Sequence, residues 1–314
     1  MKFKLADKPI VSREIVKNKF DTDIQHFMLP VVESIQNSVI AVLFADRDAK
    51  NRSFIRRIHI DMEPFPHISG KSVETVFQPG ELGCFDDNGV SPSSVVSSEN
   101  ITKLLYYIGW KPRSTVRFGL FGGLAIQIAG NKYTRVSRAP IFTLSDSEPF
   151  HVLTAPWVLF DKKSSIFRMW YVSGTGWKSP DTPCYNIKYA ESSDGKHWDQ
   201  NICVCLDNTE EITSLARPSV IKTKNGFHMW YSKKSPKTEY SIHHVYSVDG
   251  KNWGPMENSS ELSLHSNFNC EWASEMVCYS YPFVYNNNLY IFHNGNGYGS
   301  TGFGITSIPL KKLI

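Results

Sequence analysis

The chain has 314 residues, of which 41% are hydrophobic and 20% charged, so it can bury a sizeable core and is not mainly disordered. Lys and Arg exceed Asp and Glu by only 34 to 30, and the basic residues are scattered along the chain, which disfavours nucleic acid as a partner. The N-terminus lacks the apolar core of a signal peptide, and the longest apolar stretches are too short to span a bilayer. We therefore expect a cytoplasmic protein without a membrane span.

Cysteine and histidine patterns argue against disulfides and metal. The six cysteines show neither dense disulfide spacing nor a CxxC pair, so we expect reduced thiols. The ten histidines show no HExxH spacing. The sequence thus predicts no metal site and no cofactor, and it does not indicate an oligomeric state.

A repeat with a period of 62 to 64 residues runs through the whole chain. Its clearest marks are five prolines, each followed by small, β-branched or aromatic residues typical of a strand: Pro30, Pro92, Pro156, Pro218 and Pro282. Successive prolines are 62, 64, 62 and 64 residues apart. Such regularity indicates five equivalent structural units.

Each proline strand precedes a second apolar strand, which is rich in aromatic residues in the last four units. In chain order these second strands are predicted at residues 40–44, 104–110, 167–173, 227–232 and 289–295. In two units a third strand then enters an Asp-Gly turn, at Asp194-Gly195 and Asp249-Gly250, and a fourth strand leaves it through a tryptophan. Four antiparallel strands per unit, repeated radially, predict an all-β, five-bladed β-propeller that forms one domain over residues 1–314.

The two ends of the chain bear on how the ring closes. The last unit ends near Pro309 without enough sequence for a fourth strand, whereas residues 4–11 have no place in the first unit. We expect residues 4–11 to supply the missing outer strand of the last blade and so to protect its edge.

The repeated blocks carry a resemblance to a known superfamily. Five blades, an inner strand led by X-Pro, and the runs Met-Trp-Tyr and Ser-Asp-Gly-x-x-Trp are similar to the arabinanases, β-xylosidases, invertases and levansucrases. Residues 85–92, 216–218, 274–279 and 294–299 also resemble uncharacterised glycosidase-like proteins of surface-polysaccharide gene clusters. The resemblance spans essentially the whole chain and implies a carbohydrate or activated-sugar ligand, bound in a funnel over the propeller axis.

In those enzymes, carboxylates near the start of the inner strands converge on the funnel, one as acid and one as base or nucleophile. This chain departs from the pattern in two places. Leu29 stands directly before the first proline, where the family has its aspartate, and Thr154-Ala155-Pro156 replaces the Arg-Asp-Pro of the invertase branch. The usual base is therefore missing.

Candidate catalytic residues follow from their distance to the inner-strand prolines. Asp87 and His151 each lie five residues before a proline and present titratable side chains from neighbouring blades. Asp86 is a further candidate, although Asp86-Asp87 could equally cap a turn. Glu275 lies seven residues before Pro282, and its apolar neighbours suggest partial desolvation and a raised carboxyl pKa.

Other side chains are candidates for holding the substrate. Arg217 directly precedes its proline and should meet either a carboxylate or an anionic ligand. Trp110 and Trp177 are placed to stack on a sugar ring, while most aromatic residues of the repeated strands belong to the core. Glu148 and Asn296 complete the substrate-binding candidates.

Three functions remain open on this sequence. The first is a glycoside hydrolase-like enzyme that cleaves or transfers a glycosyl unit with Asp87 and Glu275. The second is a non-catalytic sugar-binding propeller, favoured by the missing aspartate before Pro30. The third is a transferase that acts on an activated sugar.

Overall fold

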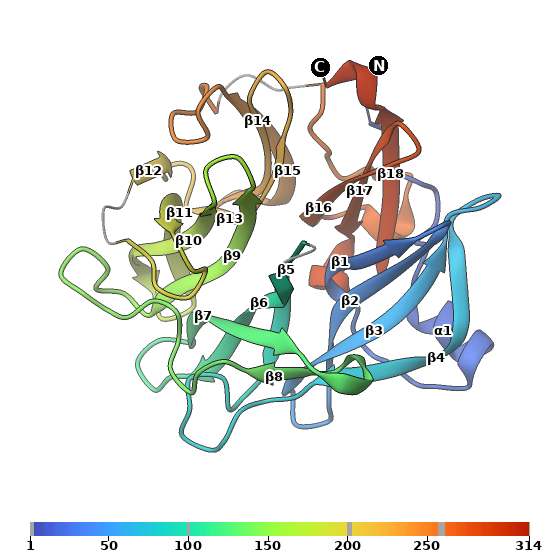
Figure 1. Ribbon diagram of the computed structural model, residues 1–314, viewed down its shortest axis with the longest axis horizontal. Coiled ribbons are helices and arrows are strands. Elements are labelled where there is room, and N and C mark those ends of the chain that lie inside the picture. Colours follow the sequence, from blue (N-terminus) through green and yellow to red (C-terminus); the bar gives the residue numbers. More distant parts are fainter. Residues whose placement is uncertain (1–2, 99–100, 200–202, 257–260, 314) are drawn as a thin grey trace.

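The computed structural model describes residues 3–98, 101–199, 203–256 and 261–313. Its strands form consecutive antiparallel groups that follow one another around a common centre (Figure 1). The first group is β1 (Met28–Gln36), β2 (Val39–Arg47), β3 (Ser53–Asp61) and β4 (His67–Phe77). The second is β5 (Val90–Ser98), β6 (Ile101–Pro112), β7 (Phe118–Gln127) and β8 (Tyr133–Arg135).

The remaining groups complete the circle. The third is β9 (Val152–Asp161), β10 (Ile166–Ser179), β11 (Thr182–Ser192) and β12 (Cys203–Leu206). The fourth is β13 (Ser214–Lys222), β14 (Phe227–Ser235) and β15 (Thr238–Ser247), and the fifth is β16 (Cys278–Tyr285), β17 (Asn288–Asn294) and β18 (Phe303–Pro309). Short parallel contacts join β7 to β9 and β11 to β13, so three groups merge into one 11-stranded sheet.

The first strand of each group lies nearest the centre. Strands β1, β5, β9, β13 and β16 contact one another in cyclic order, and β16 returns to β1 (Figure 1). In all five the register with the second strand shifts near the repeated proline. Proline lacks an N–H for the ladder, so a bulge is the natural accommodation. Leu29, Ala155 and Arg217, each directly before a proline, have φ of 57°, 50° and 53°.

The predicted proline strands and second strands are confirmed, and the Asp-Gly turns form where they were expected. Gly195 and Gly250 have φ of 73° and 78°, which glycine adopts without a steric penalty. The prediction of the fourth strands was wrong in position, because Trp198 and Trp253 lie outside any strand. In the third group β12 begins at Cys203, and in the described part of the fourth group only an isolated bridge between Ile242 and Leu264 follows the turn.

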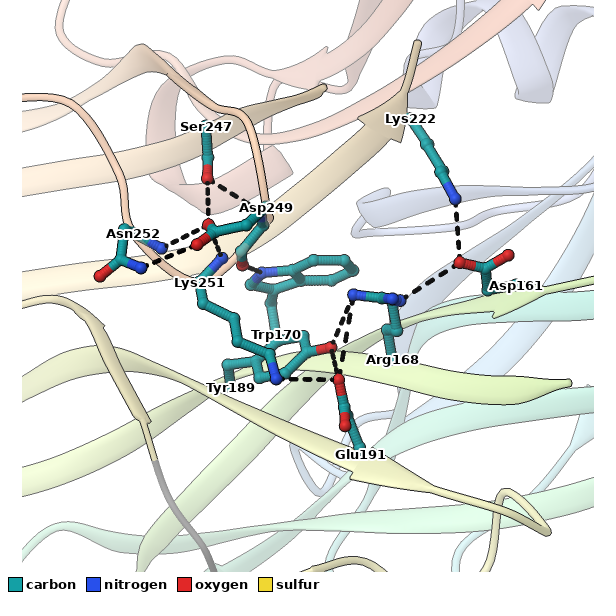
Figure 2. A network of polar contacts seen from close by, with 11 residues as sticks. Asp161, Arg168, Trp170, Tyr189, Glu191, Lys222, Ser247, Asp249, Lys251 and Asn252 are labelled. Atoms are coloured by element: carbon teal, nitrogen blue, oxygen red, sulfur yellow. Dashed lines mark hydrogen bonds and ion pairs between the residues drawn. The ribbon is translucent and has the colours of Figure 1, made fainter. Parts of the chain in front are cut away.

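Successive groups are tied together through these turns. In the second group the Tyr106 hydroxyl donates to the Gly195 carbonyl at 2.8 Å, and in the third the Trp170 indole N–H donates to the Gly250 carbonyl at 2.8 Å. Figure 2 shows Trp170 beside the turn that Asp249 organises, where one Asp249 oxygen accepts the backbone N–H groups of Lys251 and Asn252. The same interaction thus recurs one repeat later.

The N-terminal segment lies against the last group but does not form the predicted strand. Within residues 4–11 the only β-bridge is the isolated antiparallel one between Val11 and Phe303 of β18, where the Ile10 backbone N–H also donates to the Phe303 carbonyl at 3.0 Å. The Ala6 carbonyl accepts the Trp272 indole N–H at 2.9 Å, and the Lys4 carbonyl accepts the Thr306 hydroxyl at 2.8 Å. Hydrogen bonds from side chains of the last group to this backbone therefore replace most of the β-ladder that was expected with β18.

The all-β prediction is confirmed apart from one short helix that the repeat did not indicate. Helix α1 (Arg13–Phe20) has Ser12 as its N-cap, and the cap residue after it, Asp21, is left-handed. Short 3₁₀ turns occupy Ala129–Asn131, Glu271–Ala273, Asn296–Gly299 and Leu310–Lys312. Among the described residues, no helix is long and apolar enough to cross a membrane. All six cysteines are free thiols.

Candidate functional site

A cavity of about 620 Å³ lies where the inner strands β1, β13 and β16 begin. Its lining includes Met28 and Leu29 from β1, Ser214 from β13 and Tyr279 from β16. The rest of the wall comes from the ends of strands and the turns of all five groups, among them Arg47 of β2 and Tyr298 after β17. The volume falls within the range of pockets that hold small ligands.

Aromatic side chains form much of this wall: Trp110, Phe118, Tyr185, Tyr240, Tyr279 and Tyr298. The Tyr279 and Tyr298 rings stack at 6.2 Å, and the Tyr185 and Tyr240 hydroxyls contact each other. Burial raises the pKa of the Tyr185, Tyr240 and Tyr279 phenols, which are therefore neutral at ordinary pH. Neutral phenols offer flat apolar faces together with hydroxyl donors.

Charged side chains in the cavity are mostly basic. Four cations line it, Arg47, Arg117, Lys234 and Lys237, against two carboxylates, Asp181 and Glu239. The Lys234 ammonium and Glu239 carboxylate form an ion pair at 2.7 Å. With that pair neutral, the cavity keeps three cations and one carboxylate, which favours an anionic ligand.

The structure places the two predicted aspartates of the second group, Asp86 and Asp87, outside the cavity lining. Asp86 is fully buried and accepts hydrogen bonds from the Tyr107 hydroxyl at 2.9 Å and from the Arg135 Nε at 2.7 Å. Asp87 pairs with the Lys111 ammonium at 2.8 Å and accepts the Gly83 backbone N–H at 2.8 Å. Both carboxylates thus have structural partners.

Glu275 and Asn296 lie together, but neither residue lines the cavity. The expected desolvation of Glu275 was wrong, because the residue is exposed. The Asn296 side-chain oxygen accepts the backbone N–H groups of Glu275 and Met276 at 2.9 and 3.1 Å, and its amide nitrogen donates to the Glu271 carbonyl at 2.9 Å. Asn296 therefore fixes the loop instead of offering its amide to a ligand.

The two candidates just before the third group, Glu148 and His151, also have partners within the protein. Glu148 is 4% exposed and accepts hydrogen bonds from Tyr171 and Ser173, with the Lys188 ammonium 3.0 Å away. His151 packs edge-on against Phe121, and partial burial lowers its pKa. Neither residue lines the cavity, and within the described residues no hydrogen bond or ion pair joins His151 to Asp87.

Arg217 does not meet the carboxylate that the sequence led us to expect. Its side chain is 1% exposed and reaches from β13 to β5, where Nη1 donates to the Pro92 carbonyl at 2.9 Å and contacts the Ser93 hydroxyl at 3.5 Å. Burial lowers its pKa to about 10. Among the described side chains no carboxylate pairs with it. Arg217 is thus a buried link between inner strands, not part of the cavity lining.

Of the predicted substrate-binding residues, Trp110 lines the cavity, and its indole N–H donates to the Ser91 hydroxyl at 3.2 Å. Trp177 does not line it but packs edge-on against the cavity residue Phe118, with ring centroids 5.4 Å apart. Tyr185, Tyr240, Tyr279 and Tyr298 were not predicted as site residues, because most aromatic residues of the repeat were expected to lie in the core. One signal for Tyr279 was available, since it lies three residues before Pro282.

The described residues contain no group of three or more His, Cys, Asp or Glu side chains arranged to hold a metal ion. The candidate site is therefore built from aromatic rings, hydroxyls and charged side chains. Such a set can hold a sugar through ring faces and hydrogen bonds.

Comparison with known proteins supports this description of the fold. Two proteins of Mycobacterium tuberculosis strains, the uncharacterised proteins MT1551 and Rv1502, are each 34% identical over 289 residues, which cover 91% of this chain and 94% of theirs. The chain belongs to the family of these two proteins. No known family model matches it.

Solved structures extend the likeness at the level of fold. A structure of a complex of BT0996 with RGII has a TM-score of 0.72 at 18% identity, and the match covers 98% of this protein and 91% of that one. A glycoside hydrolase has the same TM-score at 16% identity and covers 98% and 92%. The chain therefore shares the propeller-like fold of glycoside hydrolases.

Proposed function

We propose that this protein binds a carbohydrate in the cavity where the inner strands begin. The chain would form one five-bladed propeller domain over residues 1–314, with its groups of strands as blades. The observation that carries the proposal is the set of aromatic rings in a cavity of about 620 Å³, with neutral phenol hydroxyls among them. The glycosidase-like fold supports it only as an analogy.

The positions of the predicted carboxylates fit sugar binding better than the glycoside cleavage that the sequence led us to expect. Asp86 and Asp87 are paired with Arg135 and Lys111, and Glu275 is an exposed loop residue. None of the three lines the cavity, so the hypothesis that Asp87 and Glu275 cleave a glycoside has no support from the geometry.

One observation favours glycosyl cleavage or transfer as a second candidate function. Asp181, in the turn between β10 and β11, and Glu239 of β15 both line the cavity. Glycosidases use two carboxyl groups, one as acid and one as base or nucleophile. Asp181 would act as the base, whereas Glu239 would first have to leave its ion pair with Lys234 and take up a proton before it could act as the acid.

Calorimetric titration with fragments of neutral and acidic polysaccharides tests the binding proposal. Trp110→Ala should weaken the affinity for any bound sugar tenfold or more, about 1.4 kcal/mol, because the ring face in the cavity is lost. Trp110→Phe keeps a ring and should retain most of the affinity. Absence of binding to every fragment, or equal affinities for wild type and Trp110→Ala, would refute the proposal.

The same fragments test the second candidate. Release of reducing ends that disappears in Asp181→Asn and Glu239→Gln, while both variants still bind the sugar, would establish cleavage at this site. Binding by the wild type without any reaction product would leave the protein as a sugar-binding propeller.

A further inference from the structure

Ion pairing sets the arginines of the cavity apart from most others in the chain. Seven arginines form salt bridges with carboxylates in the described structure: Arg13, Arg52, Arg56, Arg57, Arg135, Arg138 and Arg168. Arg47 and Arg117, which both line the cavity, form none with the described residues. Most arginines of this fold are neutralised, but those that face the cavity are not.

The backbone holds both residues firmly at the cavity. Arg47 is the last residue of β2, and its Nη1 donates to the Asn51 side-chain oxygen at 3.1 Å. Arg117 directly precedes β7, and its backbone N–H donates to the Pro180 carbonyl in the turn between β10 and β11 at 2.8 Å. The two arginines thus line the same cavity from different strand groups.

Arg47 is half-buried at the cavity, whereas Arg117 is exposed. Burial lowers the pKa of Arg47; the Arg117 charge lowers it further, whereas Tyr279 raises it. Lys234, by contrast, is balanced by Glu239 at 2.7 Å. Arginines that line a cavity without a carboxylate partner can bind an anion there through charge-assisted hydrogen bonds.

We propose that Arg47 and Arg117 form an anion subsite that binds the carboxylate or phosphate group of an acidic sugar. This inference rests on the proposed carbohydrate binding and narrows the ligand class. Guanidinium groups suit both anions because their planar N–H donors match two oxygens at once. The sugar ring would lie against the aromatic wall that includes Trp110.

Titrations of the full chain with three probes, with binding measured by saturation-transfer NMR, test the subsite. The probes are glucose, glucuronate and glucose 1-phosphate, which share a ring and differ in charge. We expect at least one acidic probe to bind ten times more tightly than glucose at low salt. The preference should shrink as salt shortens the screening length from about 30 Å at 0.01 M to about 8 Å at 0.15 M.

Substitutions assign the effect to the two arginines. Arg47→Gln and Arg117→Gln should each weaken binding of the acidic probe tenfold or more and leave glucose binding unchanged. The matched control is Arg138→Gln, which removes an exposed arginine paired with Glu81 away from the cavity lining. Thermal unfolding of all three variants identifies any loss of folding.

The outcomes separate this inference from the proposal on which it rests. Equal binding of glucose and both acidic probes would overturn the anion subsite while sugar binding stands. Loss of glucose binding in Arg47→Gln or Arg117→Gln with intact folding would also overturn it. Binding of none of the three probes would overturn the subsite, whereas the proposed function is refuted only if the polysaccharide fragments also fail to bind. A preference for glucuronate or for glucose 1-phosphate would identify the anion as carboxylate or phosphate.

Discussion

At the scale of single residues, the arginines show how position in the fold decides a role. Arg217 occupies the place directly before an inner-strand proline, yet the left-handed turn of its backbone accompanies a side chain that crosses to β5. The sequence indicates that this arginine is unusual, because a charge on an inner strand needs partners. It cannot indicate that the partners are a carbonyl and a hydroxyl from a strand 125 residues away.

We predict that Arg217 matters for folding more than for ligand binding. Arg217→Ala should lower the free energy of unfolding by about 2–4 kcal/mol, as large-to-small substitutions in packed cores do. Denaturant unfolding measures this, with Arg138→Ala as the exposed control. Unchanged stability combined with loss of sugar affinity would instead return Arg217 to the role of a ligand-binding residue.

A second residue-scale prediction concerns pH. Burial lowers the pKa of His293 to about 4, and the ring stacks on Trp272 at 5.2 Å. The unfolded chain takes up this proton near pH 6.5, so the stability that neutral His293 contributes is complete above that pH and is lost as pH falls toward 4. His293→Phe should flatten this part of the stability profile.

Thermal unfolding between pH 7 and pH 5 checks the prediction. At pH 5 the proton taken up by the unfolded state should account for about 1–2 kcal/mol of the loss in the wild type. His67→Phe, at an exposed position, is the control and should keep the wild-type slope. Equal slopes for wild type and His293→Phe would contradict the prediction. Buried His228, His243 and His244, with pKa values lowered to about 4, 3 and 3, should add to the wild-type slope.

At the scale of elements, the strands could be predicted from the sequence much more fully than the residues of the site. Inner and second strands follow from the proline spacing and from alternation of apolar residues, which are local signals repeated five times. The outer strands differ between groups, and the helix α1 has no counterpart elsewhere in the repeat. Site residues such as Arg47 and Tyr240 come from single strand ends, so no repeated pattern marks them.

The links between neighbouring groups give an element-scale prediction. Tyr106→Phe removes the hydroxyl that reaches the Gly195 carbonyl and leaves this buried acceptor without that donor. The free energy of unfolding should fall by about 1–3 kcal/mol. Tyr246→Phe is a suitable control, because the more exposed Tyr246 hydroxyl donates to the Asn225 carbonyl within its own group. Equal stability of Tyr106→Phe and wild type would show that the turn is held by other contacts.

At the scale of the whole molecule, the ends of the chain meet. Figure 1 shows both termini on the side of the last strands, and β16 contacts β1 to complete the circle of inner strands. The need to cover the edge of the last group could be predicted from the missing fourth strand. The contacts that cover this edge could not be predicted. Burial of Phe3 and the hydrogen bond from the Trp272 indole to the Ala6 carbonyl are long-range interactions that no local sequence pattern marks.

These contacts predict that the N-terminal segment stabilises the entire ring. Deletion of residues 1–12 removes the buried Phe3 and Val11 side chains and the bridge from Val11 to Phe303. Loss of two buried apolar side chains costs about 1.5–3 kcal/mol each. The melting temperature should therefore fall by several degrees, at roughly 2–4 °C for each kcal/mol in a chain of this size.

Phe3→Ala in the full chain is the matched point variant and should reproduce part of the decrease. Because α1 begins at Arg13, circular dichroism of the truncated protein shows whether this helix persists. A melting curve unchanged by the deletion would mean that β18 and Trp272 are stable without the segment, and that the circle of inner strands alone holds the two ends together.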